Sequence, residues 1–562
     1  MSERVFAVII GSGFGGLGAA IALRKAGLSD LVVLEKADSV GGTWRENTYP
    51  GCACDVPSHL YSFSFERNPR WSETYSPQAE IRAYLERCAD KYDVRRHVRF
   101  GAEAVSAELD EASGLWTVTT RKGDRFEARV VIGAVGPLHR FSLPKIPGLD
   151  RFRGKVIHSA RWDHAFDPRG QRVAAVGSGA SAIQFIPAIV DDVARMHVFV
   201  RTPAWILPRE ERRYTELEKQ LFERLPLASW LVRQEIFLRH ELRTLGFVRE
   251  KRILAFAERL ARRHLAEAIA DPGLREILTP DYRMGCKRIL LSNTYYPALA
   301  KPHVEVIGRG LERVTEGGVL GPDGVERPVD AILLGTGFDV HDYLGPMRVR
   351  GRGGRDLGEQ WAKEGAHAFY GVTAPGFPNF FTLVGPNTGL GSNSIVFMIE
   401  AQIEMIMKIV GLVRGRPGAL VEVREEVERA FNARVQEKLR STIWETGCHA
   451  WYHDASGRNC TLWPGPRVNV SGALGSVPRL HGRIEPFIHV ECGRIVQMLA
   501  PRALALRPAE RETVMAAAVA RVVDHEWVHI TTQSAAHSEH GVMQGQFTVL
   551  DLLEDSERAQ NR

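Results

Sequence analysis

Cysteine is scarce in this chain of 562 residues, and long uninterrupted apolar runs are missing. Seven cysteines over this length predict reduced thiols in a cytosolic protein rather than a secreted disulfide framework. The longest apolar stretch, 395–413, is interrupted by charges such as Glu400 and Lys408. It therefore predicts an amphipathic core helix and no integral membrane segment. Because the N-terminus also lacks a cleavable signal pattern, we expect a cytoplasmic protein.

Blocks of one charge sign and clusters of metal ligands are also missing. Lys and Arg total 73 against 67 Asp and Glu, and the two signs are interspersed, which argues against nucleic-acid binding. Cys52 and Cys54 lack the spacing of a zinc site or of a redox dithiol, so we expect them to be packed in a core. His537 and His540 have no second ligand cluster and predict a solvated loop. No metal site is expected.

A glycine-rich loop follows the first apolar run of the chain. A β-branched stretch leads into GSGFGG, a helix-compatible stretch follows, and a second apolar run ends at Glu35. Gly11 permits a tight turn, Gly13 lets the backbone approach a pyrophosphate, and Gly16 lets helix pack on strand. Glu35 can bind the hydroxyls of a ribose. This unit is expected to hold the adenosine of FAD.

The same pattern returns later in the chain. Its characteristic positions are Gly177, Gly179, Ser181, Arg201 and Thr202. Arg201 lies 24 residues after the first glycine of its unit, and Glu35 lies 24 residues after the first glycine of the first unit. A guanidinium at that place binds a 2′-phosphate that an acid would repel, so the second unit is expected to bind NADPH. The alternative for Arg201 is a solvated arginine at a strand end.

Two apolar segments that end in small residues, 130–137 and 331–339, flank the second unit and indicate places where the backbone passes close to a neighbour. Together these patterns predict an α/β fold with two Rossmann-like dinucleotide-binding domains and an inserted helical subdomain. The expected domains are FAD-binding at 1–145 and 376–470, NADPH-binding at 146–209 and 281–375, a helical insertion at 210–280, and a C-terminal extension of unassigned role at 471–562.

A longer motif, FRGKVIHSARWD, stands between the two units. It matches the pattern FxGxxxHxxxW followed by Pro or Asp, at Phe152, Gly154, His158, Trp162 and Asp163. With this motif the chain resembles the Baeyer–Villiger monooxygenases, a branch of the class B flavoprotein monooxygenases, over residues 5–470. A second pattern of that family is matched at Gly42, Thr43, Trp44 and Asp55. The resemblance gives His158 and Trp162 a conformational role rather than a chemical one.

The resemblance implies an enzyme that binds FAD and NADPH and uses O2 to convert ketones to esters or lactones through a C4a-peroxyflavin. Arg288 matches the arginine that stands over the flavin, and Asp55 is expected to orient it as counter-ion. These two are the expected catalytic residues. Lys287 matches the lysine that helps hold the 2′-phosphate, together with Arg201 and Thr202.

Trp451 resembles the tryptophan that touches the nicotinamide cofactor. Without the resemblance, Lys287 and Arg288 would be a solvated surface pair and Trp451 a core aromatic. Three alternatives for the whole chain stay open. They are a flavin monooxygenase that oxidises nitrogen or sulfur, a pyridine-nucleotide disulfide reductase, for which the required CxxC is missing, and a flavoprotein module without catalysis. The ketone and the oligomeric state are not determined by the sequence.

Overall fold

A computed structural model gives the structure of the chain. It describes residues 2–248, 251–391, 393–448 and 450–465, and the strand pairs 475–476, 479–480, 483–484 and 489–490. The chain divides into two compact units, Met1–Ile236 with Gly246–Pro464 and Phe237–Leu245 with Gly465–Arg562. Apart from those short strands, the expected C-terminal extension, with His537 and His540, lies outside the described residues.

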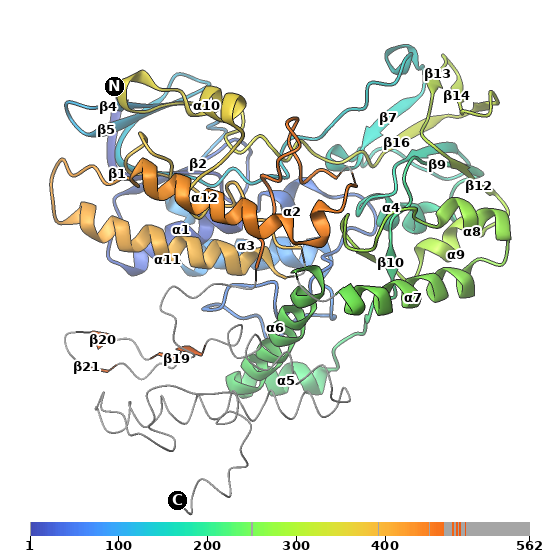
Figure 1. Ribbon diagram of the computed structural model, residues 1–562, viewed down its shortest axis with the longest axis horizontal. Coiled ribbons are helices and arrows are strands. Elements are labelled where there is room, and N and C mark those ends of the chain that lie inside the picture. The colour runs from blue at the N-terminus through green and yellow to red at the C-terminus, as the bar shows by residue number, and fades with distance from the viewer. Residues whose placement is uncertain are drawn as a thin grey trace, which may run out of the picture. The chain divides into compact units, whose positions relative to one another are not determined.

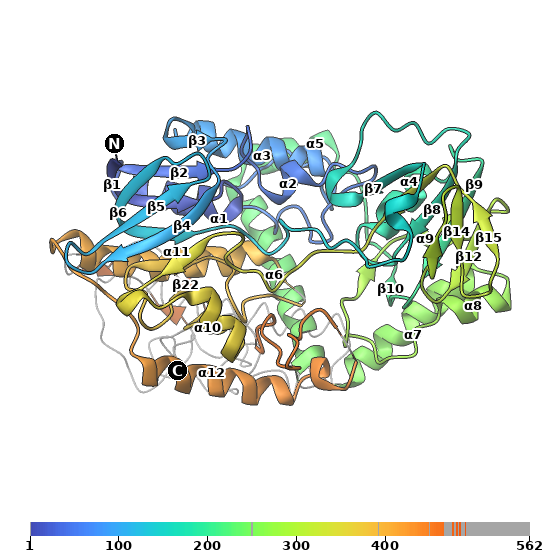
Figure 2. The same cartoon turned by 90° about the horizontal axis from the view of Figure 1, so that it is seen from above.

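The first sheet of the larger unit has eight strands in the order β17-β4-β5-β6-β1-β2-β3, with β18 paired to β6. Their bounds are β1 (Ser2–Ile10), β2 (Leu31–Glu35), β3 (Val98–Phe100), β4 (Ala104–Asp110), β5 (Leu115–Thr120), β6 (Arg125–Gly133), β17 (Arg348–Arg350) and β18 (Phe380–Thr382). Strand β2 and residues 5–10 of β1 are nearly continuous apolar runs because both faces of this parallel part of the sheet are covered. Strands β4, β5 and β6 form an antiparallel ribbon beside β1 (Figure 2).

Helices α1 (Phe14–Lys25) and α10 (Leu357–Glu364) pack on this sheet. The same lobe also contains α2 (Thr43–Glu46), α3 (Gln78–Lys91), α11 (Ile395–Arg414) and α12 (Glu425–Arg440). Helix α11 runs along α1 (Figure 1), where a side chain at Gly18 would overlap Phe63 and Ile403. Its buried residues recur at helical spacing, which confirms the amphipathic core helix expected at 395–413. No helix among the described residues is long and apolar enough to span a bilayer.

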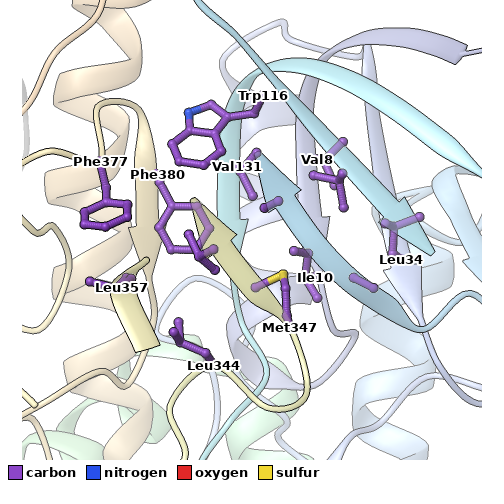
Figure 3. Close-up of a cluster of buried hydrophobic side chains, with 14 of the residues drawn as sticks. Val8, Ile10, Leu34, Trp116, Val131, Leu344, Met347, Leu357, Phe377 and Phe380 are labelled. Carbon is purple, nitrogen blue, oxygen red and sulfur yellow. The ribbon is translucent and has the colours of Figure 1, made fainter. Parts of the chain in front are cut away.

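A buried cluster lies between β1, β5, β6 and the segment 343–380 (Figure 3). Trp116 is fully buried, its ring centroid lies 5.3 Å from that of Phe380, and its Nε1 donates a hydrogen bond to the carbonyl oxygen of Pro378. Truncating such a side chain to alanine costs about 3–5 kcal/mol. The cluster thus joins the N-terminal strands to residues more than 200 positions later in the chain.

The second sheet is wholly parallel, in the order β12-β9-β8-β16-β7. Its strands are β7 (Lys155–His158), β8 (Arg172–Val176), β9 (Arg195–Val200), β12 (Val304–Gly308) and β16 (Ala331–Leu334), and its helices are α4 (Ala182–Ile189) and α9 (Tyr295–Leu299). A small antiparallel sheet, β13 (Arg313–Val314), β14 (Gly318–Leu320) and β15 (Glu326–Pro328), and a parallel pair, β10 (Ile206–Leu207) and β11 (Leu290–Leu291), complete this lobe.

Four helices lie between β10 and β11 in the chain: α5 (Glu216–Arg224), α6 (Pro226–Val248), α7 (Lys251–Ala268) and α8 (Pro272–Leu278). Helix α5 begins with a capping box in which Thr215 and Glu218 satisfy each other's backbone N–H groups. The α/β fold with two dinucleotide-type sheets and a helical insertion is therefore confirmed. The boundaries of the four expected domains stay a prediction.

The expectation that all cysteines are reduced thiols is wrong. Cys286 and Cys448 form a disulfide with a Cα–Cα distance of 6.3 Å across a sequence separation of 162. The other cysteines within the described ranges, Cys52, Cys54, Cys88 and Cys460, are free and buried. Cysteine number and spacing could not predict this bond, because the fold brings together two residues that the sequence keeps far apart.

Candidate functional site

The first glycine loop has no room for side chains at its two ends. Gly11 has φ +101°, and a Cβ there would lie 2.5 Å from the carbonyl oxygen of Ala134. A Cβ at Gly16 would overlap the carbonyl oxygen of Gly11. This close approach is the one that the small residues after β6 predict. The first turn of α1 has neither a capping side chain nor an acidic residue, so its N–H groups are open to an anion.

Glu35 ends β2 and is buried beside this loop. One of its carboxylate oxygens accepts hydrogen bonds from the backbone N–H and the hydroxyl of Ser12, at 3.0 and 2.6 Å. The other accepts from the backbone N–H of Ala37 at 3.0 Å and pairs with Arg45 at 2.9 Å. A carboxylate offers about four acceptor positions, so a ribose hydroxyl can bind Glu35 only by replacing one of these donors.

The second loop repeats the first with two changes. Gly177 has φ +123°, and a Cβ there would collide with the carbonyl oxygen of Gly335, at the end of β16. The place of the third glycine is taken by Ala182, which is buried at the start of α4. A Cβ at Gly179 would meet nothing within 4 Å. The loop is held to the end of β9 by the Ser178 hydroxyl, which donates to the carbonyl oxygen of Thr202 at 2.6 Å.

Two cations lie close together beside the second loop. The side chain of Arg201 is exposed, and among the described residues it has no hydrogen-bond or ion-pair partner. Partial burial lowers the pKa of Lys287, and the like charge of Arg201 lowers it further, while Asp281 opposes the shift. The ammonium group of Lys287 lies 4.9 Å from the ring centroid of Tyr282. Two neighbouring cations facing one acid leave an excess of positive charge that can bind an anion such as a phosphate.

One segment, residues 41–55, connects the two loops. At its start a Cβ on Gly42 would lie 2.9 Å from the Cα of Gly13. In its middle the Tyr49 hydroxyl donates to the side-chain oxygen of Gln184 in α4 at 2.9 Å. Gln184 in turn donates to the carbonyl oxygen of Ala53 at 3.0 Å. The family pattern predicted from the sequence therefore runs from the first glycine loop to the helix that follows the second.

Asp55, at the end of this segment, pairs with Arg288. Nη2 and Nε of Arg288 donate to the same Asp55 oxygen at 2.6 and 3.1 Å. Burial would raise the pKa of Asp55, but the charge and hydrogen bonds of Arg288 outweigh it and keep that pKa below its usual value. Asp55 likewise raises the pKa of Arg288. The side chain of Arg288 is 37% exposed and that of Asp55 is 30% exposed. The guanidinium is therefore oriented by Asp55 and still accessible to a ligand.

The aromatic pair Trp451 and Tyr452 lies on the segment that follows η5 (Ile443–Glu445). Their ring centroids are 4.4 Å apart; Trp451 is 44% exposed, whereas Tyr452 is buried. Burial raises the pKa of Tyr452, and the charge of Arg288 opposes the shift. Trp451 is therefore not a core aromatic residue, as the alternative interpretation had it, whereas its neighbour Tyr452 is buried.

The FRGKVIHSARWD motif forms β7 and the turn after it. A Cβ at Gly154 would collide with Phe152 and with the carbonyl oxygen of Asp330. Nδ1 of His158 accepts from the backbone N–H of Ala160 at 3.1 Å, and burial followed by the charge of Arg161 lowers the pKa of His158 to about 4.

The rings of Trp162 and Phe185 in α4 lie 5.9 Å apart, and Asp163 pairs with Lys155 at 2.7 Å. His158 is thus neutral near pH 7 and packed, which agrees with a structural or conformational role. The expected role itself stays a prediction.

Several contacts of the site were not anticipated from the sequence. Gln184 and Arg209 reach the Asp55 segment from the other lobe; Arg209 donates to the carbonyl oxygen of Cys54 at 3.2 Å. Tyr452, Cys286 and Cys448 also border Arg288 or its turn. For Tyr452, Cys448 and Cys286 the available signal was their closeness in sequence to Trp451 or Lys287, and for Gln184 and Arg209 there was no signal in the sequence. Within the described part of the chain, no three His, Cys, Asp or Glu residues are grouped as metal ligands.

Comparisons with known proteins agree with this geometry. The family model described as pyridine nucleotide-disulphide oxidoreductase matches residues 8–227, which include both glycine loops. A Baeyer–Villiger monooxygenase of Streptomyces coelicolor is 51% identical over 467 residues, covering 82% of this chain and 89% of the relative. The chain belongs to the Baeyer–Villiger monooxygenase family.

Solved structures agree. Cyclohexanone monooxygenase from Rhodococcus sp. Phi1 bound to NADP+ has a TM-score of 0.74 and 31% identity, covering 82% of this chain and 95% of that one. The OTEMO complex with FAD and NADP has a TM-score of 0.74 and 27% identity, covering 83% and 96%. The predictions of a ketone-oxidising flavin monooxygenase and of FAD and NADPH as its cofactors are confirmed. Its reactants include a small molecule and O2.

Proposed function

We propose that the Arg288–Asp55 pair is the centre at which this monooxygenase oxygenates a ketone. The observation that carries the proposal is the course of residues 41–55, which pass from the first glycine loop to α4 and end on Arg288. A guanidinium held there is contributed by one lobe and its carboxylate by the other. The reacting atoms of two nucleotide cofactors, one bound at each loop, would converge on such a place.

The residues of the first loop fit FAD. A glycine cradle without side chains, an uncapped helix start and an acid at the end of β2 match the pyrophosphate and ribose of a dinucleotide. The residues of the second loop fit NADPH, because Arg201 and Lys287 offer two positive charges to its 2′-phosphate. When bound, FAD takes hydride from NADPH and activates O2.

The chain's own contribution is positional and electrostatic. Arg288 presents a fixed positive charge to the oxygen on which negative charge develops during attack on the ketone carbonyl. Because Asp55 raises the pKa of Arg288 further, the guanidinium cannot protonate that oxygen. Asp55 is a positioning residue: both of its hydrogen bonds go to one edge of the guanidinium, Nε and Nη2, and leave Nη1 for the reactants.

The test is a product analysis with matched substrates. Purified enzyme with FAD, NADPH and air is given a panel of cyclic and linear ketones and a panel of thioethers of the same carbon skeletons. We expect ketone products that are heavier by one oxygen atom and are esters or lactones. Sulfoxides as the only oxygenated products would favour the heteroatom alternative, and NADPH oxidation without any oxygenated product would favour a flavoprotein without oxygenase activity.

A further inference from the structure

The disulfide between Cys286 and Cys448 lies next to the Arg288 site without belonging to it. Cys286 is two residues before Arg288, and Cys448 is three residues before Trp451. The bond therefore joins the short turn that carries the guanidinium to the segment that carries the aromatic pair. These two segments are 162 residues apart in the chain.

Arg288 stands between two anchors. Downstream, the backbone N–H of Leu290 donates to the carbonyl oxygen of Trp205 at 2.9 Å as β11 pairs with β10. Upstream, the disulfide at Cys286 is the covalent anchor. Only residue 287 separates the upstream anchor from Arg288, so movement of Cys286 is passed directly to the guanidinium.

The turn before the disulfide is also closely packed. Gly285 has φ +91°, and a Cβ there would lie 3.2 Å from Phe247 and 3.3 Å from Ile443 and Leu254. Phe247, Leu254 and Ile443 belong to one buried cluster with Tyr452. The segment of Cys448 is held in turn by Glu445, whose carboxylate binds His453 and Asn459 at 3.1 Å each. Both sides of the disulfide are thus fixed to packed structure.

We propose that the Cys286–Cys448 disulfide is a positioning element for Arg288, and that opening it uncouples NADPH oxidation from ketone oxygenation. This inference rests on the proposed role of Arg288. In the coupled reaction, ketone, O2, NADPH and a proton give ester, NADP+ and water. In the uncoupled reaction, O2, NADPH and a proton give hydrogen peroxide and NADP+. The ratio of ester to NADPH consumed reports which reaction occurs.

A dithiol reagent opens the bond. The S–S bond breaks, two protein thiols form with two protons and two electrons from the reagent, and the reagent closes into its own cyclic disulfide. Cys286 is buried, whereas Cys448 is only partly buried, so we expect exchange to begin at Cys448. Titration of the denatured protein for thiols counts the two that appear.

The experiment compares the oxidised enzyme, the dithiol-reduced enzyme and the double variant Cys286→Ser/Cys448→Ser, well below their unfolding temperatures. We expect reduction to lower the ester-to-NADPH ratio by about threefold to a hundredfold, the upper end being typical of an ångström-scale misplacement. Bound flavin and the rate of its reduction at saturating NADPH should stay unchanged, because saturation offsets any displacement of Lys287, which lies between Cys286 and Arg288. Reoxidation should restore the ratio, which damage to the fold would not allow.

Two controls separate this effect from others. The double variant should resemble the reduced enzyme and should not respond to the dithiol, which excludes an action of the reagent on flavin. Cys88→Ser removes a free buried cysteine and should behave like the unmodified enzyme, including its response to the dithiol.

An unchanged ratio after complete reduction would overturn the proposal, as would a fall that occurs only together with loss of flavin or unfolding. If the oxidised enzyme makes no ester from any ketone, the proposed function fails instead.

Discussion

The two glycine loops have the same backbone geometry but differ in how many contacts the protein itself makes with their binding residues. In both, the first glycine has a positive φ and faces the carbonyl oxygen of a returning strand end. Glu35, however, is buried and bonded to four protein donors, whereas Arg201 is exposed and has no partner in the described chain. A Cβ at Gly13 would lie 3.5 Å from the Cα of Gly42, whereas a Cβ at Gly179 would meet nothing within 4 Å. This difference supports the proposal that the first loop holds a cofactor that stays bound and the second a cofactor that exchanges.

The largest expected effect comes from substituting the first glycine of each loop. Gly11→Ala and Gly177→Ala each place a Cβ against a backbone oxygen at a positive φ. We expect Gly11→Ala to be purified with little flavin and Gly177→Ala to retain flavin but lose most of its reduction by NADPH. Absorbance of bound flavin and stopped-flow reduction measure the two outcomes. If Gly177→Ala lost flavin instead, the assignment of the loops would be reversed.

A smaller effect should follow from the charge beside the second loop. Arg201→Ala removes one of the two cations available to the 2′-phosphate, and a charge-assisted contact is worth ~1.5–3 kcal/mol. The KM for NADPH should rise about ten- to hundredfold, with little change for NADH. Steady-state kinetics with both cofactors tests this. An equal rise for both cofactors would mean that Arg201 acts on the fold and not on the phosphate.

The last expected effect is on stability rather than on activity, and it concerns one buried histidine in each lobe. Burial, followed by nearby arginines, lowers the pKa of His59 and of His158 from 6.5 to about 4. Between those values the unfolded chain binds more protons than the folded one, so stability is complete above pH 6.5 and falls as the pH drops toward 4. Each histidine accounts for up to about 3 kcal/mol.

Urea unfolding at pH 7.5 and 5.0 checks this. His158→Gln should lose part of the pH dependence, whereas replacement of the exposed His164 should leave it intact. An unchanged pH dependence in His158→Gln would contradict the lowered pKa.

The local parts of this site could be predicted from sequence because their residues are close in the chain. The loop from Gly11 to Glu35 is one strand-turn-helix-strand unit, and spacing alone places its glycines and its acid. Arg201 follows from the same spacing. The parallel sheets follow from the apolar runs that precede each loop.

The long-range parts could not be predicted in the same way. Tyr49 and Gln184 are 135 residues apart, and Arg288 and Asp55 are separated by 233. Only the family resemblance suggested the second pair, and nothing suggested the first. The prediction of reduced thiols was wrong because a count of cysteines describes the chain as a whole, whereas a disulfide depends on which two cysteines the fold brings together.

The most direct measurement is a single turnover of Arg288→Ala beside the unmodified enzyme. Both proteins are reduced anaerobically with NADPH, mixed with aerated ketone, and analysed by mass spectrometry. We expect flavin reduction in both, an ester or lactone from the unmodified enzyme, and only hydrogen peroxide with unchanged ketone from the variant. Ester from the variant in the same yield and at the same rate would contradict the catalytic role of the guanidinium at position 288.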